Sequence, residues 1–210
     1  MTLPLLTADG LTLEHRWSVP HDFDRVAVLC HPHPLQGGSM DAPLLRRVKN
    51  VLTERGFAVL RFNFRGVGAS HGSHGGGVSE VQDIEAAVEL ARTSHPDLPL
   101  GIAGWSFGSV IALRWSAQHR SDLPYAGIAP PVGSDLILEL PEIRHLVPAP
   151  RTLIIGDNDQ FTTVDKVEDY AASIGAKVEV VKGSDHFFFT KEGVVGELVA
   201  AALSHTELRT

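Results

Sequence analysis

One segment constrains the fold more than any other in this chain. An apolar run at residues 98–103 leads directly into the pentapeptide Gly-Trp-Ser-Phe-Gly at 104–108, and a helix-forming run at 110–114 leads directly out. Glycines two positions before and after a serine permit a sharp strand-to-helix turn that lifts the serine hydroxyl out of a sheet. A turn of this kind requires a sheet with helices packed on its faces.

The rest of the chain supplies the alternation that such a fold needs. Continuous apolar runs predict strands covered on both faces, and apolar residues at three- and four-residue spacing predict amphipathic helices between them. An Asp9-Gly10 turn between residues 3–7 and 11–17 predicts an antiparallel opening hairpin. The further predicted strands are 26–30, 57–62, 98–103, 125–129, 151–155 and 177–181, and the predicted helices are 40–55, 80–94, 107–119, 164–174 and 192–203, with one short helix within 130–150.

We therefore expect a single α/β domain over residues 1–210, with about eight mostly parallel strands and helices on both faces. Only about twenty residues separate the strand at 125–129 from the strand at 151–155, too few for a multi-helix cap domain over the sheet edge. The prediction is an open site rather than a covered one.

Composition narrows the class of partner and the compartment. The 18 Lys and Arg against 25 Asp and Glu give a formal charge of −7, which disfavours nucleic acid and anionic membranes as partners. Cys30 is the one cysteine, so no intramolecular disulfide forms and a reducing compartment is expected. The first ten residues carry no basic start and no long apolar stretch. We expect a cytoplasmic protein that acts on a small molecule.

Ser106, at the centre of the pentapeptide, is the candidate nucleophile. It would lie at the carboxyl edge of a parallel sheet, where open α/β folds bind ligands, and the helix that follows would favour a developing negative charge. The alternative is a glycine-bounded turn that holds an inert serine. The order of the remaining candidates along the chain favours the catalytic interpretation.

A serine hydroxyl needs a base to take its proton, and the base needs an acid to orient it. Among eleven histidines, His186 follows the last predicted strand and precedes the closing helix. Asp159 leaves the preceding predicted strand with a Gly-x-x-Asp spacing, and Asp157 is the second candidate. Asp185 adjoins His186 in sequence and is expected to serve the turn. The order serine, acid, histidine is the one found in folds that carry such a strand-to-helix serine turn.

Acyl transfer also needs donors for the oxyanion of the tetrahedral intermediate. The backbone amide of Phe107, the residue after the nucleophile, is the first expected donor. The second should come from the loop at 31–38, which follows the strand at 26–30. Because the two prolines in this loop have no N–H, the donor is His33 or Leu35.

Taken as a set, these motifs resemble the small lidless bacterial α/β-hydrolases related to dienelactone hydrolase. The motifs are His-Pro-His-Pro-Leu-x-Gly-Gly at 31–38, Phe-Asn-Phe-Arg-Gly-Val-Gly-Ala-Ser at 62–70, the serine pentapeptide, and the late Asp and His. The resemblance spans about residues 26–189. It implies the α/β-hydrolase fold without a cap, and it implies His33 as the second oxyanion donor. Pro32 replaces the usual glycine, and we expect a cis His33–Pro34 bond in this loop.

Three other interpretations carry less weight. The glycines at 66–72 follow a strand, but their spacing is one residue off a dinucleotide-binding loop, so we expect a loop at the rim of the site in which Arg65 pairs with a carboxylate. A zinc site is not expected, although four histidines fall in the loops at this edge: His31, His33, His71 and His74. Cys30 ends an apolar strand and is expected to be a packed core residue.

The sequence therefore predicts a serine hydrolase of the carboxylesterase or thioesterase type, with no cofactor and no metal. Small esters and thioesters are the expected substrates, amides remain open, and Trp105 and Phe161 are expected to line the site. A homodimer through an exposed apolar last helix is a further expectation. The alternative from another class is a catalytically idle ligand-binding or interaction protein on the same fold.

Overall fold

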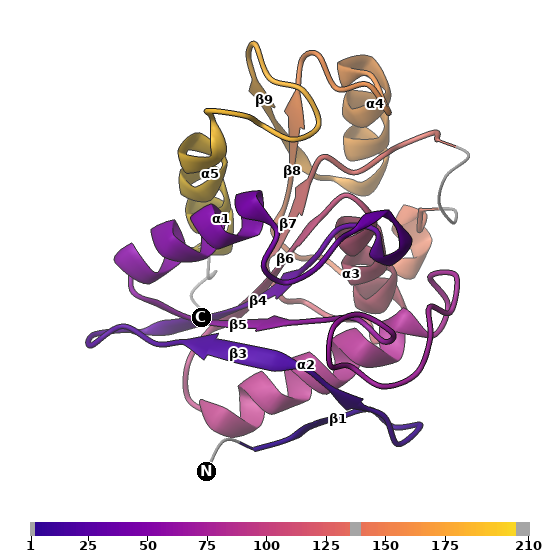
Figure 1. Ribbon diagram of the computed structural model, residues 1–210. Coiled ribbons are helices and arrows are strands. Elements are labelled where there is room, and N and C mark those ends of the chain that lie inside the picture. The colour runs from indigo at the N-terminus through magenta and orange to yellow at the C-terminus, as the bar shows by residue number, and fades with distance from the viewer. Residues whose placement is uncertain (1–2, 135–139, 205–210) are drawn as a thin grey trace.

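A seven-stranded sheet forms the centre of the computed structural model, which describes residues 3–134 and 140–204 (Figure 1). Its strand order is β3-β5-β4-β6-β7-β8-β9. Strand β3 runs antiparallel to β5, and all other neighbours are parallel. The strands are β3 (His15–Ser18), β4 (Arg25–Cys30), β5 (Phe57–Phe62), β6 (Leu100–Trp105), β7 (Tyr125–Ile128), β8 (Arg151–Gly156) and β9 (Lys177–Val181). The α/β-hydrolase fold expected from the sequence is confirmed.

The opening hairpin is also present, but it lies outside the main sheet. Strands β1 (Leu5–Leu6) and β2 (Thr12–Leu13) pair only with each other, antiparallel. The predicted strand at 11–17 divides, because Leu5 and Leu13 are buried in the core beside α2, whereas the residues from His15 onward pair with β5. The main sheet therefore has seven strands rather than the eight expected.

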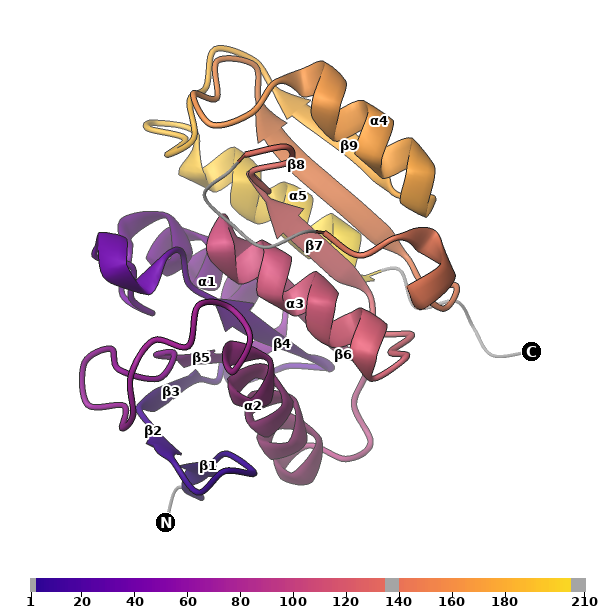
Figure 2. The ribbon, with the colours of Figure 1, turned by 90° about the vertical axis from the view of Figure 1, so that its right-hand side faces the viewer.

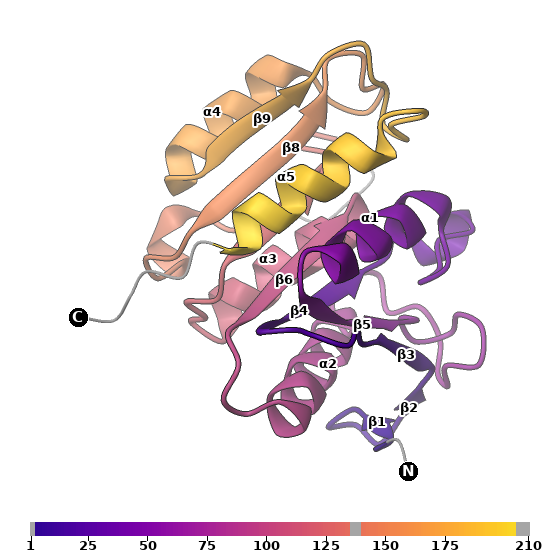
Figure 3. The same cartoon turned by 90° about the vertical axis from the view of Figure 1, so that its left-hand side faces the viewer.

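Helices cover both faces of the sheet, as Figures 2 and 3 show from opposite sides. Helices α1 (Pro43–Glu54) and α5 (Glu192–Ser204) lie on one face. Helices α2 (Glu80–Ser94), α3 (Phe107–Gln118) and α4 (Val164–Ile174) lie on the other. Helix α1 begins at Pro43 rather than Met40, because proline at the first helical position forfeits no intrahelical hydrogen bond.

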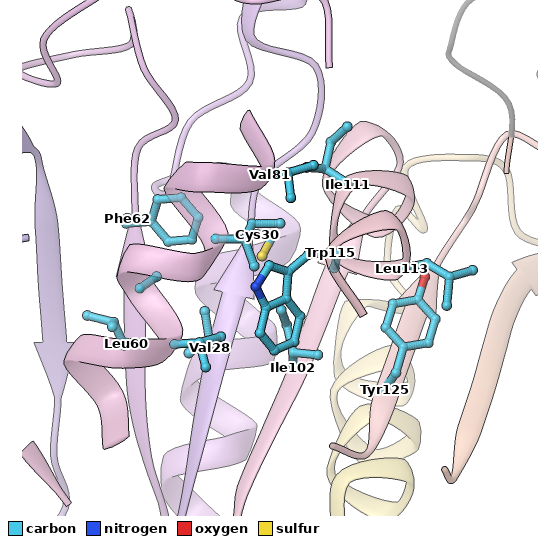
Figure 4. Close-up of a cluster of buried hydrophobic side chains, with 14 of the residues drawn as sticks. Val28, Cys30, Leu60, Phe62, Val81, Ile102, Ile111, Leu113, Trp115 and Tyr125 are labelled. Atoms are coloured by element: carbon cyan, nitrogen blue, oxygen red, sulfur yellow. The ribbon is translucent and has the colours of Figure 1, made fainter. Parts of the chain in front are cut away.

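The two faces bury separate apolar cores. Between the sheet and helices α2 and α3, the side chains labelled in Figure 4 come from β4, β5, β6 and β7 and from both helices. Cys30 belongs to this core and is fully buried, and burial raises the pKa of its thiol above the usual range. Trp115 of α3 and Tyr125 of β7 are among the largest fully buried residues there. The expectation of a packed cysteine is confirmed.

The last helix is not the exposed apolar surface that the sequence suggested. Val195, Val199 and Leu203 of α5 are buried against α1 and the sheet, so the apolar residues serve the core of one chain. Val194 is the large apolar residue of α5 that stays exposed, at 48%, and a homodimer through this helix remains a prediction. Within the described ranges no helix is both long and apolar enough to cross a lipid bilayer.

The chain progresses across the sheet in opposite directions on the two sides of β4, and this change of direction positions the site. Strand β4 pairs with β5 on one side and with β6 on the other, so the loops that leave β4 and β6 emerge side by side. Open α/β sheets bind ligands at such a switch point, outside the carboxyl ends of the strands. The loops after β4, β5, β8 and β9 all gather at this edge (Figure 2).

The connection from β7 to β8 crosses near the same edge without a cap domain. Of its described residues, only the 3₁₀ turn η2 (Ile143–His145) is helical, which matches the one short helix predicted within 130–150. Residues 135–139 lie outside the described part of the chain.

Candidate active site

Ser106 occupies the tight turn between β6 and α3. Its backbone is in the left-handed region, with φ 53° and ψ −118°, which a non-glycine residue seldom adopts. The flanking glycines make this turn sterically feasible. A Cβ on Gly104 would lie 2.4 Å from backbone atoms of Gly108, and a Cβ on Gly108 would lie 2.5 Å from the carbonyl oxygens of Cys30 and His31. The pentapeptide therefore brings the serine, the start of α3 and the end of β4 together.

Helix α3 begins at Phe107, directly after this serine. The first amides of an α-helix have no partner within the helix, and the helix dipole places partial positive charge there. The Phe107 amide thus lies at an anion-binding position beside Ser106. The amide of Ser106 itself donates to the Ile128 carbonyl at 2.8 Å, which fixes the turn to strand β7.

Asp159 and His186 form a buried hydrogen-bonded pair. The Nδ1 atom of His186 lies 2.8 Å from Oδ2 of Asp159, and the two side chains are 5% and 0% exposed. The Phe161 amide donates to the other carboxylate oxygen at 2.8 Å. With Nδ1 held by the carboxylate, the free Nε2 is the atom left to exchange protons.

The other two aspartates of these loops brace turns. Oδ1 of Asp157 accepts from the amides of Gly183 and Ser184, in the loop after β9. Oδ1 of Asp185 accepts from the amides of Phe187 and Phe188, at 2.9 and 3.0 Å. Asp159 is thus the carboxylate bonded to the imidazole, and Asp185 serves the turn as expected.

Trp105 ties the backbone of His186 to the residue next to Ser106. Its indole Nε1 donates to the His186 carbonyl at 3.2 Å, and the two ring centroids lie 6.1 Å apart. The Gln160 side chain accepts from the His186 amide at 3.2 Å. Among the residues that the structure describes, no hydrogen bond joins the Ser106 hydroxyl to the imidazole. No sequence pattern pointed to Gln160, whose contribution depends on the path of the folded loop.

Of the two candidate oxyanion donors in the loop after β4, one amide already donates a hydrogen bond within the loop. The Leu35 amide donates to Nδ1 of His33 at 3.2 Å, and its side chain is 74% exposed. The His33 ring packs on the Phe107 ring with centroids 5.0 Å apart. This leaves the His33 amide as the candidate beside the start of α3. The predicted cis His33–Pro34 bond is wrong, since no described peptide bond is cis and His33 has the extended φ −54°, ψ 120° usual before proline.

His31 connects the ends of two strands. Its Nδ1 lies 2.6 Å from the Pro32 carbonyl, and its Nε2 accepts from the Phe64 amide at 3.0 Å, so both ring nitrogens are engaged. Burial lowers the pKa of His31 to about 4, which keeps the ring neutral at physiological pH. This histidine holds the loop after β4 against the loop after β5.

The glycine-rich loop is anchored by a buried ion pair. Arg65 donates to both carboxylate oxygens of Asp83 through its side chain and its backbone amide, and it also reaches Asp9 at 2.8 Å. The Arg65 side chain is 6% exposed and that of Asp83 is 0% exposed. The expectation that Arg65 pairs with a carboxylate is confirmed, and the pair also joins helix α2 to the loop.

A second histidine and carboxylate pair joins the end of this loop to the start of α2. Nδ1 of His74 is 2.7 Å from the fully buried Glu80 carboxylate, which also accepts from the amides of Gly75 and Gly77. The His74 ring lies 5.1 Å from that of His33, and burial lowers the pKa of His33. Glu80 was not singled out in the sequence. The signal that could have found it is a glutamate in the first turn of a helix that begins shortly after a glycine run.

Of the two predicted lining residues, Trp105 is nearly buried and Phe161 is half-exposed at 38%. The Phe161 ring stands edge-on to the His186 imidazole, 4.6 Å between centroids. Trp105 therefore packs beneath His186 on the buried side of the site, and Phe161 lies at the solvent-exposed surface of the site.

Comparison with known proteins places this geometry in a class. Residues 33–132 match the family described as serine aminopeptidase, S33. The chain is 32% identical over 173 residues to Uncharacterized protein RP471 of Rickettsia prowazekii, covering 78% of this chain and 71% of that protein. An α/β serine hydrolase homologue from Coxiella burnetii is 28% identical, with a TM-score of 0.83 and 96% of each chain covered.

A second solved structure matches equally well and carries no lid. This α/β serine hydrolase of Xanthomonas campestris is 28% identical, with a TM-score of 0.84, and the match covers 99% of this chain and 96% of that one. The fold and these matches place the chain among the α/β hydrolases. The chain belongs to the α/β-hydrolase family, and the matches support a hydrolase.

Proposed function

We propose that the protein is a serine hydrolase that cleaves small carboxylic esters or thioesters through an acyl-enzyme on Ser106. The observation that carries the proposal is the buried hydrogen bond between His186 and Asp159, on loops beside a serine held at φ 53°. The Trp105 indole, one residue before that serine, donates to the His186 carbonyl and holds the pair next to the turn. Strained backbone of this kind concentrates at functional sites.

In the first half of the reaction, Ser106 Oγ attacks the acyl carbon while Nε2 of His186 takes the hydroxyl proton. The oxyanion is stabilised by the amides of Phe107 and His33, and Asp159 stabilises the imidazolium. His186 then returns the proton to the leaving alcohol or thiol as its bond to carbon breaks. Because hydrogen bonds of a catalytic serine tighten when substrate binds, the open Ser106 hydroxyl is compatible with this role.

In the second half, water takes the place of the leaving group. His186 accepts a proton from water, the hydroxide attacks the acyl carbon, and the returned proton frees Ser106 Oγ together with the carboxylic acid. No cofactor or metal enters either half. The lidless edge favours short, soluble acyl groups, because nothing on the described part of the β7–β8 connection would cover a long chain.

Turnover of p-nitrophenyl esters of increasing acyl length tests the proposal. We expect the wild type to hydrolyse the acetate, with activity falling as the acyl chain lengthens, and Ser106→Ala to lose at least about 1,000-fold in kcat. Ser109→Ala is the matched control, since that hydroxyl only bonds the Ser106 carbonyl. Equal turnover by wild type and Ser106→Ala would overturn the proposal.

The idle-protein alternative predicts a different result from the same panel: no ester is turned over, although the chain is folded. Amino acid p-nitroanilides belong in the panel as well, because the matching family is described as an aminopeptidase. Turnover of these amides in preference to esters would replace the ester proposal with peptidase activity on the same serine.

A further inference from the structure

An exposed group of aromatic side chains borders the candidate base. Phe161, Phe187 and Phe189 are 38%, 39% and 68% exposed, and we call them the aromatic ledge. We propose that this ledge binds the apolar, preferably aryl, alcohol portion of the ester substrate. The inference rests on the proposed function, because it specifies which part of the substrate the same site selects.

The ledge is continuous with the His186 ring. The Phe161 and Phe187 rings both stand edge-on to the imidazole, with centroids 4.6 and 5.6 Å away. Phe189 lies 5.8 Å from Phe187, and the Phe187 ring also meets Trp105 at 6.1 Å. Edge-on and offset rings at these distances form a surface on which another aromatic ring can pack.

The backbone conformation of the loop after β9 keeps the Phe187 and Phe189 rings exposed to solvent. Between them, Phe188 is fully buried, and its φ of 55° lies in the left-handed region. Asp185 caps this turn by accepting from the amides of Phe187 and Phe188. A phenylalanine in the left-handed region is strained. The loop thus buries the Phe188 ring at the expense of backbone strain and leaves the Phe187 and Phe189 rings exposed to water. That exposure is unfavourable unless a ligand or partner covers them.

The chemistry of the proposed reaction identifies which end of the substrate covers them. The bond between the acyl carbon and the leaving oxygen breaks as His186 Nε2 delivers to that oxygen the proton taken from Ser106, so the alcohol departs on the His186 side. The carbonyl oxygen points to the Phe107 amide and the loop after β4, on the other side of Ser106. The ledge borders His186, and therefore it meets the alcohol rather than the acyl group.

Paired esters separate this inference from general hydrophobic effects. Benzyl acetate and ethyl acetate share the acyl group and have alkoxide leaving groups, and they differ in the aryl ring. In Phe187→Ala/Phe189→Ala we expect kcat/KM for benzyl acetate to fall about tenfold or more, the size of a lost apolar contact in a pocket. Ethyl acetate should change less than about twofold. Ethyl phenylacetate, with its ring on the acyl side, should follow ethyl acetate.

Matched controls keep the outcomes distinct. Val19→Ala removes an apolar side chain of 51% exposure after β3 and should leave both acetates unchanged. Equal losses for benzyl and ethyl acetate in the double variant, or a loss that follows the acyl ring, would overturn the inference while ester hydrolysis through Ser106 stood. No turnover of any ester by the wild type would instead refute the proposed function.

Other occupants of the ledge give other results. If a second copy of the chain covers it, sedimentation velocity will show a dimer that the double variant loses. If a lipid surface covers it, phosphatidylcholine vesicles will retain the wild type and release the double variant. Either result, with the ratio of benzyl to ethyl acetate unchanged by the substitutions, contradicts the aryl-alcohol assignment.

Discussion

The two sides of Ser106 are built differently. On the donor side, formed by the loops after β4 and β5, buried polar groups fix the backbone: His31 bridges two strand ends, and Arg65 and Asp83 form a buried ion pair. On the base side, formed by the loops after β8 and β9, the buried polar contacts centre on His186, which meets Asp159 and the Trp105 indole, and apolar rings face solvent.

This difference matches what each side would do in the proposed reaction. Oxyanion donors stabilise charge only when they are already in place before reaction, so the donor side gains from rigid, buried bracing. The base side must hold the His186 imidazole in one tautomer, and it must also let the substrate bind and the leaving group depart. A single carboxylate achieves the first task, and an exposed aromatic surface suits the second.

The largest effect should come from the base side. Asp159→Asn keeps the shape of the side chain but places an amide against Nδ1 of His186, which favours the wrong tautomer. We expect kcat to fall by about 10³ to 10⁴ with the fold intact. Asp157→Asn is the control, because its Oδ1 can still accept from the loop amides, and it should lose less than about threefold. Similar losses in the two variants would remove Asp159 from the mechanism.

The next effect should come from the donor side and appear in stability. Among the described residues, Asp83→Asn leaves buried Arg65 with Asp9 as its remaining charged partner, and we expect the free energy of unfolding to fall by about 3 to 5 kcal/mol. Urea unfolding measures the change. Glu197→Gln, which breaks the exposed pair with Arg55, should leave the urea midpoint unchanged. If both variants unfold at the same midpoint, the donor side is not braced as described.

A smaller effect should follow from the neutral state of His31. Its pKa is lowered from 6.5 to about 4 in the folded protein, so on acidification the unfolded chain takes up a proton that the folded chain refuses. Stability is therefore complete above pH 6.5 and is lost as the pH falls toward 4, by roughly 3 kcal/mol for this group. Urea midpoints from pH 7.5 to 4 should fall more steeply for the wild type than for His31→Gln. Parallel pH profiles would contradict the assignment.

The local patterns in the sequence were sufficient for most elements. Helices α2 and α4 and strand β9 were predicted with the bounds that the structure has. The pentapeptide around Ser106 was informative for a steric reason, since a Cβ at either of its glycines would lie within 2.5 Å of backbone atoms. Such constraints act over a few residues and can be seen in one sequence.

What the sequence could not predict depends on contacts between distant segments. The segment at 11–17 has one apolar pattern, but Leu13 turns into the core and His15 joins β5, a choice that depends on how α2 and β5 pack. The pairing of His74 with Glu80 could not be predicted for the same reason, because in the sequence Glu80 looks like any acidic residue in the first turn of a helix. The aromatic ledge depends on the left-handed backbone of Phe188, which no propensity favours.

The central claim is that Ser106 is a nucleophile activated by His186. Incubation with a fluorophosphonate, followed by mass spectrometry of the intact chain and its peptides, tests it directly. We predict one adduct, on the peptide that contains Ser106, formed at least about 100-fold more slowly in His186→Ala. An unmodified wild-type chain, or an adduct on another serine, would contradict the account.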